Sequence, residues 1–157
     1  MRLVTIEEVR DHCNVAGTYD DMALTRAANG AEQAAEDFLN RRVFATADDL
    51  LAAIAELPSF VESAELSRAL ARDAAQALPG EASRIAELAA CTQWERAVQQ
   101  ARETAVGIVL NGAIHDAILL IAAHLYRNRE AVTAEAAKEL PMGVDRLLWP
   151  HRVGLGV

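Results

Sequence analysis

Apolar residues recur at alternating steps of three and four along most of the chain, the spacing that keeps side chains on one face of an α-helix. The first such stretch begins with Thr5-Ile6-Glu7-Glu8, a capping-box motif in which the threonine and the second glutamate satisfy the first free amides of a helix. Ile6, Val9 and Cys13 then share a face. This pattern predicts a short helix that ends near Asn14, followed by a turn.

A second amphipathic stretch runs from Asp20 to about Asn40. Alanine forms most of its apolar stripe, so another helix can approach this one closely. Asn29-Gly30 lies in the middle and weakens the helix by about 1 kcal/mol relative to alanine, which predicts a point where the helix can kink. The stripe consists of Leu24, Ala28, Ala31, Ala35 and Phe38.

Between residues 46 and 100 the same spacing predicts several helices separated by proline or by a capping motif. The first is expected to end at Pro58, because proline lacks the amide proton and clashes with the preceding turn. The next helix opens at Ser63 and is closed by Pro79-Gly80. In the helix that follows, the capping box at residues 92–95 marks either a break or the interior of one long helix.

The segment from residue 113 to 130 is the most apolar of the chain. Leucine and alanine fill much of the surface that remains beside its main apolar face, and a helix of this kind belongs in the centre of a protein. Asn111, His115 and Asp116 interrupt the apolar run, and a membrane span needs about 20 nearly continuous apolar residues, so we expect a buried helix and no membrane contact. The preceding Asn111-Gly112 is typical of a left-handed helix end.

The last residues predict a separate element. Pro141 and Pro150 push the residue before each of them toward an extended conformation, and only a short helix fits between them. Residues 140–157 are therefore expected to form an extended arm that leaves a helical bundle made by residues 1–139. Because Leu147, Leu148 and Trp149 are costly to leave in water, the arm should dock on the body or on a partner.

Composition favours an all-α fold, and the charge argues against tight binding to nucleic acid. Alanine is abundant and aromatic residues make up 4% of the 157 residues, as expected of packed helices in one domain. The formal net charge is −8 and no cluster of basic residues interrupts it, so tight binding to DNA by counterion release is not expected. Acidic pairs such as Glu36-Asp37 are expected at helix starts and on solvated faces.

Residues that could carry catalysis lack the spacing that catalysis needs. Cys13 and Cys91 each lack a second cysteine nearby, so they are expected to be small buried or half-buried thiols in a reducing compartment. His115, Asp116 and His124 do not have the i, i+4 spacing that places two metal ligands on one helical face. Without a nucleophile elbow or a phosphate-binding glycine loop, we expect no catalytic residues, no metal and no cofactor.

Four stretches of the chain occur in a recognisable order. Residues 3–9 read LVTIEEV, a helix spans Asp20-Asp21 to Arg41-Arg42, residues 124–132 read HLYRNREAV, and residues 139–152 read ELPMGVDRLLWPHR. Together they resemble the head–tail connector family of long-tailed phages, whose members are also called head-completion or adaptor proteins. The stretch at 47–100 is longer and more helical than in compact members, so it is interpreted as a helical insertion.

The resemblance implies a non-enzymatic structural protein of the virion neck, at the head–tail interface, assembled in the host cytoplasm. Its subunits would form a homo-oligomeric ring, a dodecamer in the virion, beneath the portal protein. A stopper or tail-completion protein would attach below the ring. Genomic DNA would pass through the middle without sequence-specific binding, and acidic groups at the channel edge would keep it mobile.

The resemblance also implies roles for residues near the C-terminus. Portal or partner contacts are implied for Leu140, Pro141, Leu147, Leu148, Trp149, Pro150 and Arg152. Contacts between subunits, or a place in the motif itself, are implied for Tyr126, Asn128 and Arg129. For Tyr126 and Arg129 an ordinary helix end, with cations near the negative pole of the helix dipole, is an equal alternative. For Trp149 the alternative is packing within the chain.

Two other classes of protein share this composition. A small cytoplasmic helical interaction module without a viral role would lack chemistry in the same way, and it would bind a host protein rather than a portal. It leaves the ordered C-terminal motif unexplained. A metal-dependent hydrolase on a helical bundle would contain stoichiometric metal after purification.

Overall fold

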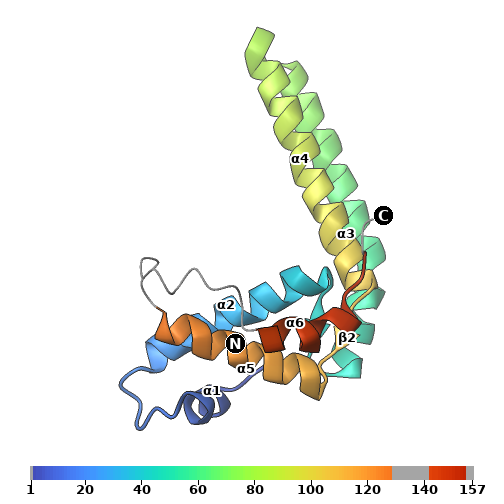
Figure 1. Cartoon of the computed structure of the whole chain (residues 1–157). Helices are drawn as coiled ribbons and strands as arrows, with labels where there is room; N and C mark the ends of the chain where they lie inside the picture. Colours follow the sequence, from blue (N-terminus) through green and yellow to red (C-terminus); the bar gives the residue numbers. More distant parts are fainter. Residues whose placement is uncertain (1, 129–141, 155–157) are drawn as a thin grey trace. The chain divides into compact units, whose positions relative to one another are not determined.

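The computed structural model describes residues 2–128 and 142–154 (Figure 1). Within these residues the chain forms six α-helices, a single 3-10 turn and two strands of two residues each, which confirms the all-α fold. The chain divides into two compact units. The first combines Met1–Ala47 with Ile108–Val157, and the second is Asp48–Gly107, which covers most of the stretch interpreted as an insertion.

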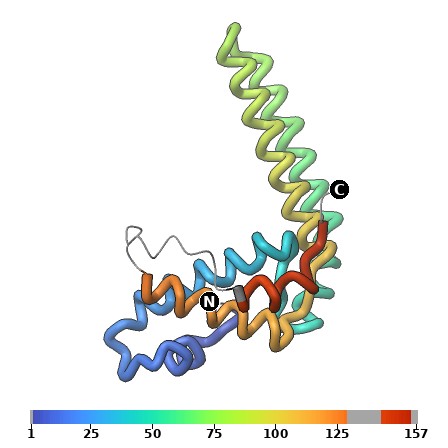
Figure 2. The backbone as a smooth tube through the Cα atoms, viewed as in Figure 1, coloured from blue at the N-terminus to red at the C-terminus, as the bar shows by residue number. Residues whose placement is uncertain are grey.

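Helices α2 and α5 form the centre of the first unit and run alongside each other (Figure 2). Around them lie α1, α6 and the turn η1. The bounds are α1 Ile6–Cys13, α2 Asp21–Leu39, α5 Gly112–Arg127, α6 Met142–Leu148 and η1 Trp149–His151. The largest fully buried side chains are Leu24, Leu39, Ile114, Ile118, Ile121, Leu148, Val9, Val43 and Val144. The apolar segment at 113–130 is therefore central, as its pattern predicts.

Helix α1 begins and ends where the local sequence predicts. The Thr5 hydroxyl accepts a hydrogen bond from the Glu8 amide at 3.3 Å, and the Glu8 carboxylate accepts one from the Thr5 amide at 2.7 Å. Asn14 ends the helix in the left-handed conformation, with φ 55°. This boundary depends only on neighbouring residues, which is why the capping motif is sufficient to predict it.

Helix α2 is continuous through Gly30. Ala28, Ala31 and Ala35 are fully buried, so the alanine stripe brings α5 close, as expected. A Cβ atom at Gly30 would lie 3.3 Å from Cδ1 of Leu125 on α5. The glycine therefore makes room for the neighbouring helix.

The segment before α5 corrects the expectation of a left-handed helix end at Asn111-Gly112. Asn111 instead begins α5: its backbone is extended, with φ −122°, and its side chain accepts a hydrogen bond from the Ile114 amide at 3.0 Å. Just before it, strand β2 (Ile108–Val109) pairs in parallel with strand β1 (Val43–Phe44). This pairing brings the chain into α5 in an extended conformation, which suits an N-cap.

The second unit is a hairpin of two long helices, α3 (Ala47–Gln76) and α4 (Gly80–Ala105). Pro58 lies inside α3 rather than at its end, and Thr92 lies inside α4, where its hydroxyl donates to the Leu88 carbonyl at 2.9 Å. The expected helix end at Pro58 is therefore wrong, and of the two alternatives for residues 92–95 the structure shows the interior of one long helix. Packing against the partner helix on both sides of Pro58 outweighs the local cost of proline, because Leu57 and Phe60 line one groove with Ala101 of α4.

Candidate partner-binding surface

The C-terminal segment packs on the body instead of leaving it. Val144 is fully buried and Leu148 is 1% exposed, and α6 contacts both α5 and α2. For residues 142–154, which are described, this corrects the expectation of an extended arm that leaves the bundle, and of the two expected ways to cover Leu148 it shows docking on the body. The physical reason is that an apolar side chain gains about 1.5–3 kcal/mol by burial, and α5 offers an apolar face within the same chain. Leu148 therefore belongs to the core and is not available to a partner.

Hydrogen bonds to the backbone of this segment and from it hold its end against the end of α2. The Val153 amide donates to the Leu39 carbonyl at 3.1 Å, and the Arg41 guanidinium donates to the His151 carbonyl at 3.1 Å. Asn40 ends α2 in the left-handed conformation, and its side-chain amide donates to the Val153 carbonyl at 3.4 Å. Residues 151–153 are thus fixed by three hydrogen bonds that the sequence pattern did not predict.

An aromatic and cationic cluster lies on the outside of this segment. The Phe38 and Trp149 rings meet edge to face with centroids 6.5 Å apart. The Arg152 guanidinium carbon lies 5.2 Å from the Phe38 centroid and 5.8 Å from that of Trp149. Within the described residues, Arg152 Nε is buried without a hydrogen-bond partner, so its interactions with the two rings position the guanidinium. We call Phe38, Trp149, Pro150 and Arg152 the aromatic surface.

The aromatic surface combines a fixed position with exposure to solvent. Trp149 is 53% exposed, Pro150 is exposed, and Leu147 is half-buried beside them. Trp149 and Pro150 line an apolar hollow of about 340 Å³ together with Asp145 and Arg146. Arg152 is half-buried between the two rings. Tryptophan and arginine are among the side chains that most often dominate the energy of protein–protein interfaces. The arrangement can bind a protein surface.

Tyr126 and Asn128 are involved in contacts within the first unit. The Tyr126 hydroxyl donates to the Asp20 carboxylate at 2.6 Å and ties the end of α5 to the start of α2. Asn128 ends α5, with its backbone amide and its side-chain amide both donating to the His124 carbonyl at 3.0 Å. These contacts favour the helix-end interpretation for Tyr126. Leu140, Pro141 and Arg129 lie outside the described residues.

Two buried carboxylates are the polar feature that the sequence analysis missed. Glu32 is 7% exposed and accepts hydrogen bonds from the backbone amides of Leu3 at 2.8 Å and Val4 at 3.3 Å. Glu36 is 6% exposed, which corrects its assignment to a solvated face. Its spacing of four residues from Glu32, beside Ala31 and Ala35 of the buried stripe, was the available signal.

Glu36 joins three parts of the chain around α2. Its carboxylate pairs with Arg2 and, at 3.1 Å, with Arg42, and it accepts a hydrogen bond from the Val43 amide at 2.8 Å. Because all of these partners are donors, the carboxylate is satisfied although it is buried. This arrangement is structural, and it holds the N-terminus and β1 onto α2.

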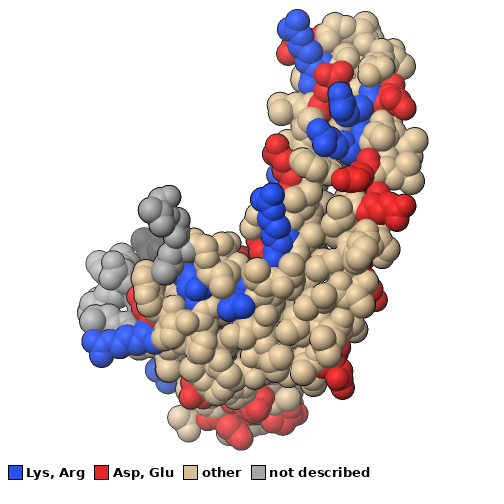
Figure 3. Space-filling model, turned by 90° about the vertical axis from the view of Figure 1, so that its right-hand side faces the viewer, with Lys and Arg blue, Asp and Glu red and all other residues tan. Residues whose placement is uncertain are grey.

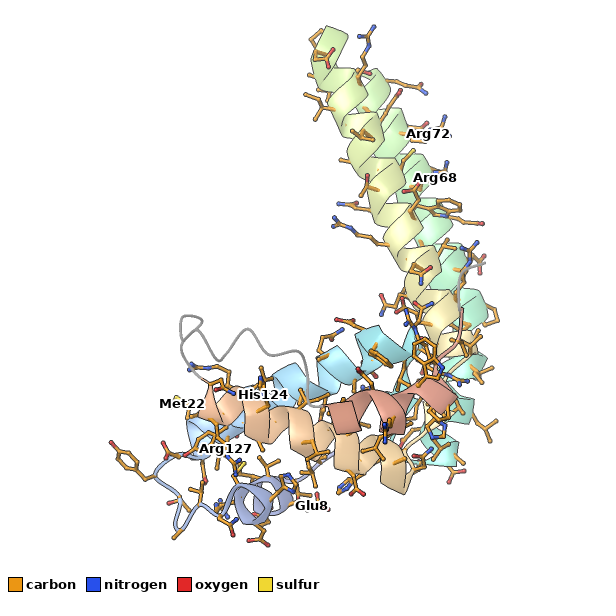
Figure 4. The ribbon with its side chains drawn as sticks, in the orientation of Figure 1. Glu8, Met22, Arg68, Arg72, His124 and Arg127 are labelled. Atoms are coloured by element: carbon orange, nitrogen blue, oxygen red, sulfur yellow. The ribbon has the colours of Figure 1, made fainter. Side chains whose placement is uncertain are left out.

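The histidines and cysteines form no metal centre in the part of the chain that is described. His115 Nε2 lies 3.4 Å from the Glu8 carboxylate. Hydrogen bonds from the Thr5 amide and hydroxyl hold the pKa of Glu8 below its ordinary value. Burial acts more weakly in the opposite direction, and His115 adds a smaller lowering of the same pKa. Burial raises the pKa of the Cys13 thiol, and Cys91 is half-buried and also free. Figure 4 shows Glu8 on α1 and His124 on α5.

Comparison with protein-family models, with curated proteins and with solved structures finds no match to the chain. Among the described helices, none is both long enough and apolar enough to cross a membrane.

Proposed function

We propose that the chain is a head–tail connector subunit of a tailed phage or prophage. In this role it forms a ring under the portal protein, extends the DNA channel and provides the attachment site for a stopper or tail-completion protein. The role is structural, and no catalysis, metal or cofactor is part of it. The proposal starts from the order of the motifs at residues 3–9, 124–132 and 139–152.

The observation that carries the proposal is the aromatic surface on the motif at 139–152. Val144 and Leu148 of that motif lie in the core of the first unit. Trp149 and Arg152 lie outside this core, so we propose that they contact a partner. Because the segment is already packed on the body, docking would cost little conformational entropy. We therefore propose that the portal binds a preformed surface and does not order a free arm.

The charge of the chain suits a conduit for DNA. Its formal net charge is −8, and a duplex passing an acidic surface is repelled instead of being held. Arginine and acidic side chains are intermixed on the hairpin surface in Figure 3, with uncharged areas between them. We propose that DNA contacts the ring only in passing.

Binding to the portal protein encoded nearest to this chain tests the proposal. Trp149→Ala should weaken portal binding by tenfold or more, roughly 1.4 kcal/mol, because truncating a central interface tryptophan commonly costs this much. Tyr19→Ala is the matched control, since Tyr19 is 97% exposed on the same unit and contributes no ring contact to the aromatic surface. Equal portal binding by both variants, or no binding by the wild-type chain, would contradict the proposal and favour the interaction-module alternative.

A further inference from the structure

The C-terminal segment at 142–154 carries two arginines without a negative partner, one on either side of Trp149. Arg146 lies three positions before Trp149, and Arg152 lies three positions after it. Among the residues that the structure describes, no carboxylate forms an ion pair with either arginine. Arg152 is half-buried against the Phe38 and Trp149 rings, whereas Arg146 is exposed. The Arg146 guanidinium is therefore open to a carboxylate of another molecule.

Two exposed carboxylates, Asp37 and Asp145, lie beside residues of the aromatic surface or its hollow. Asp37 precedes Phe38 and accepts a hydrogen bond from the Gln33 side-chain amide at 2.8 Å, one turn back along α2. Asp145 precedes Arg146 on α6. Adjacent residues of a helix point in different directions, which agrees with the lack of an ion pair between these two side chains. A partner can therefore contact the charge of Asp145 and the charge of Arg146 separately.

The local charge here differs in sign from that of the whole chain. Arg41 adds a third cation, because its guanidinium donates to the backbone of the C-terminal segment at 3.1 Å. The segment, together with Asp37 and Arg41, thus contains three arginines and two acids, whereas the whole chain has 15 basic and 23 acidic residues. Glu36, the acid before Asp37, is already paired with Arg2 and Arg42. A local excess of arginine favours a partner with negative charge.

The hollow beside Arg146 limits the size and shape of what binds there. Its volume is about 340 Å³, and Trp149 and Pro150 form its apolar lining with Asp145 and Arg146. A hollow of this size accommodates one large apolar side chain, but not a helix or a sheet. An aromatic ring beside a proline is also the kind of surface on which extended, proline-containing segments dock. These features favour an extended segment with a single apolar anchor.

We infer that the partner of the aromatic surface presents an extended segment in which an acidic side chain lies beside an apolar anchor. The anchor fills the hollow at Trp149 and Pro150, and the carboxylate pairs with Arg146. Arginine suits this contact because its planar guanidinium holds a carboxylate through two parallel hydrogen bonds. The inference rests on the proposed function for the identity of the partner, the portal protein, and adds the chemistry by which this partner is recognised.

The neighbouring charges of opposite sign on α6 test the inference through portal binding. An acidic partner predicts that Arg146→Gln weakens binding about threefold and that Asp145→Asn tightens it about twofold, as expected of exposed ion pairs. Asp11→Asn, at an exposed position of α1, changes the net charge equally and should leave binding unchanged. Opposite signs for the two α6 variants, or no effect of either on a chain that binds the portal, would overturn the inference and leave the proposed function standing.

A measurement without the portal separates the two failures. The chain has two tryptophans, so in Trp94→Phe the fluorescence of Trp149 reports on the surface alone. This variant is titrated with two synthetic peptides of leucine and proline, one containing glutamates and the other lysines. The glutamate peptide alone should give a saturable change, weakened by Arg146→Gln. A response to the lysine peptide, or to neither, would overturn the inference, whereas a response to the glutamate peptide without portal binding would contradict only the proposed function.

Discussion

Single buried charges hold the first unit together, and Glu36 is the clearest case. Glu36→Gln keeps an acceptor for the Val43 amide but leaves Arg2 and Arg42 without a negative partner. Because both arginines are partly exposed and can be hydrated, we expect a loss of about 1–3 kcal/mol in the free energy of unfolding, measured by urea denaturation. The control is Asp37→Asn on the exposed side of α2, and an equal effect of the two substitutions would contradict a structural role for Glu36.

The capping box of α1 should make stability depend on pH. The pKa of Glu8 is lowered in the folded chain, so its carboxylate stabilises the fold above the ordinary value of 4.5, and this contribution is lost as the pH falls through the lowered folded pKa. We therefore expect Glu8→Gln to lower the melting temperature at pH 7 and to match the wild type at strongly acidic pH. Glu7→Gln, one position away and exposed, should give no such convergence.

At the scale of elements, Pro58 shows whether packing of α3 against α4 can maintain a helix at a residue that locally disfavours it. Proline removes the hydrogen bond to the Ile54 carbonyl and crowds that turn, at a local cost of up to about 3 kcal/mol. We expect Pro58→Ala to stabilise α3 by about 1 kcal/mol or more, measured as a rise in the thermal unfolding temperature by circular dichroism. Ser59→Ala is the neighbouring control, and an unchanged or lower temperature for Pro58→Ala would show that the proline geometry is needed.

Elements with local signals could be predicted, and elements set by distant contacts could not. The start of α1 follows from Thr5 and Glu8, and the central place of α5 follows from its apolar surface. Asn111 was assigned to the wrong kind of helix end because the pairing of β1 with β2, which fixes its backbone, spans residues far apart in the chain. Strands of two residues are too short to show an alternating pattern.

The sequence predicts which segment forms the candidate site, but not which of its side chains are buried and which are exposed. The apolar run from Leu147 to Trp149 shows that the segment must be covered, but not whether α5 or another protein covers it. The fold divides these residues, with Leu148 in the core and Trp149 half exposed. The contacts of Phe38 with Trp149 and with Arg152 join residues over 100 positions apart, so no local pattern could reveal them.

At the scale of the whole molecule, the C-terminal segment should be part of the fold of the first unit. Leu148→Ala removes a side chain that is 1% exposed in the core, and we expect it to cost about 2–5 kcal/mol of unfolding free energy. Trp149→Ala, at the neighbouring exposed position, should cost about 1 kcal/mol, mainly through its contact with Phe38. Equal losses for the two variants in urea denaturation would contradict this division of roles.

The most direct test of the proposed function is negative-stain electron microscopy of the purified chain, alone and mixed with the portal protein encoded nearest to it. We expect rings of the chain, or an added annular layer on the portal, and loss of that layer with Trp149→Ala. A chain that leaves portal particles unchanged under conditions where both proteins are folded would contradict the connector role.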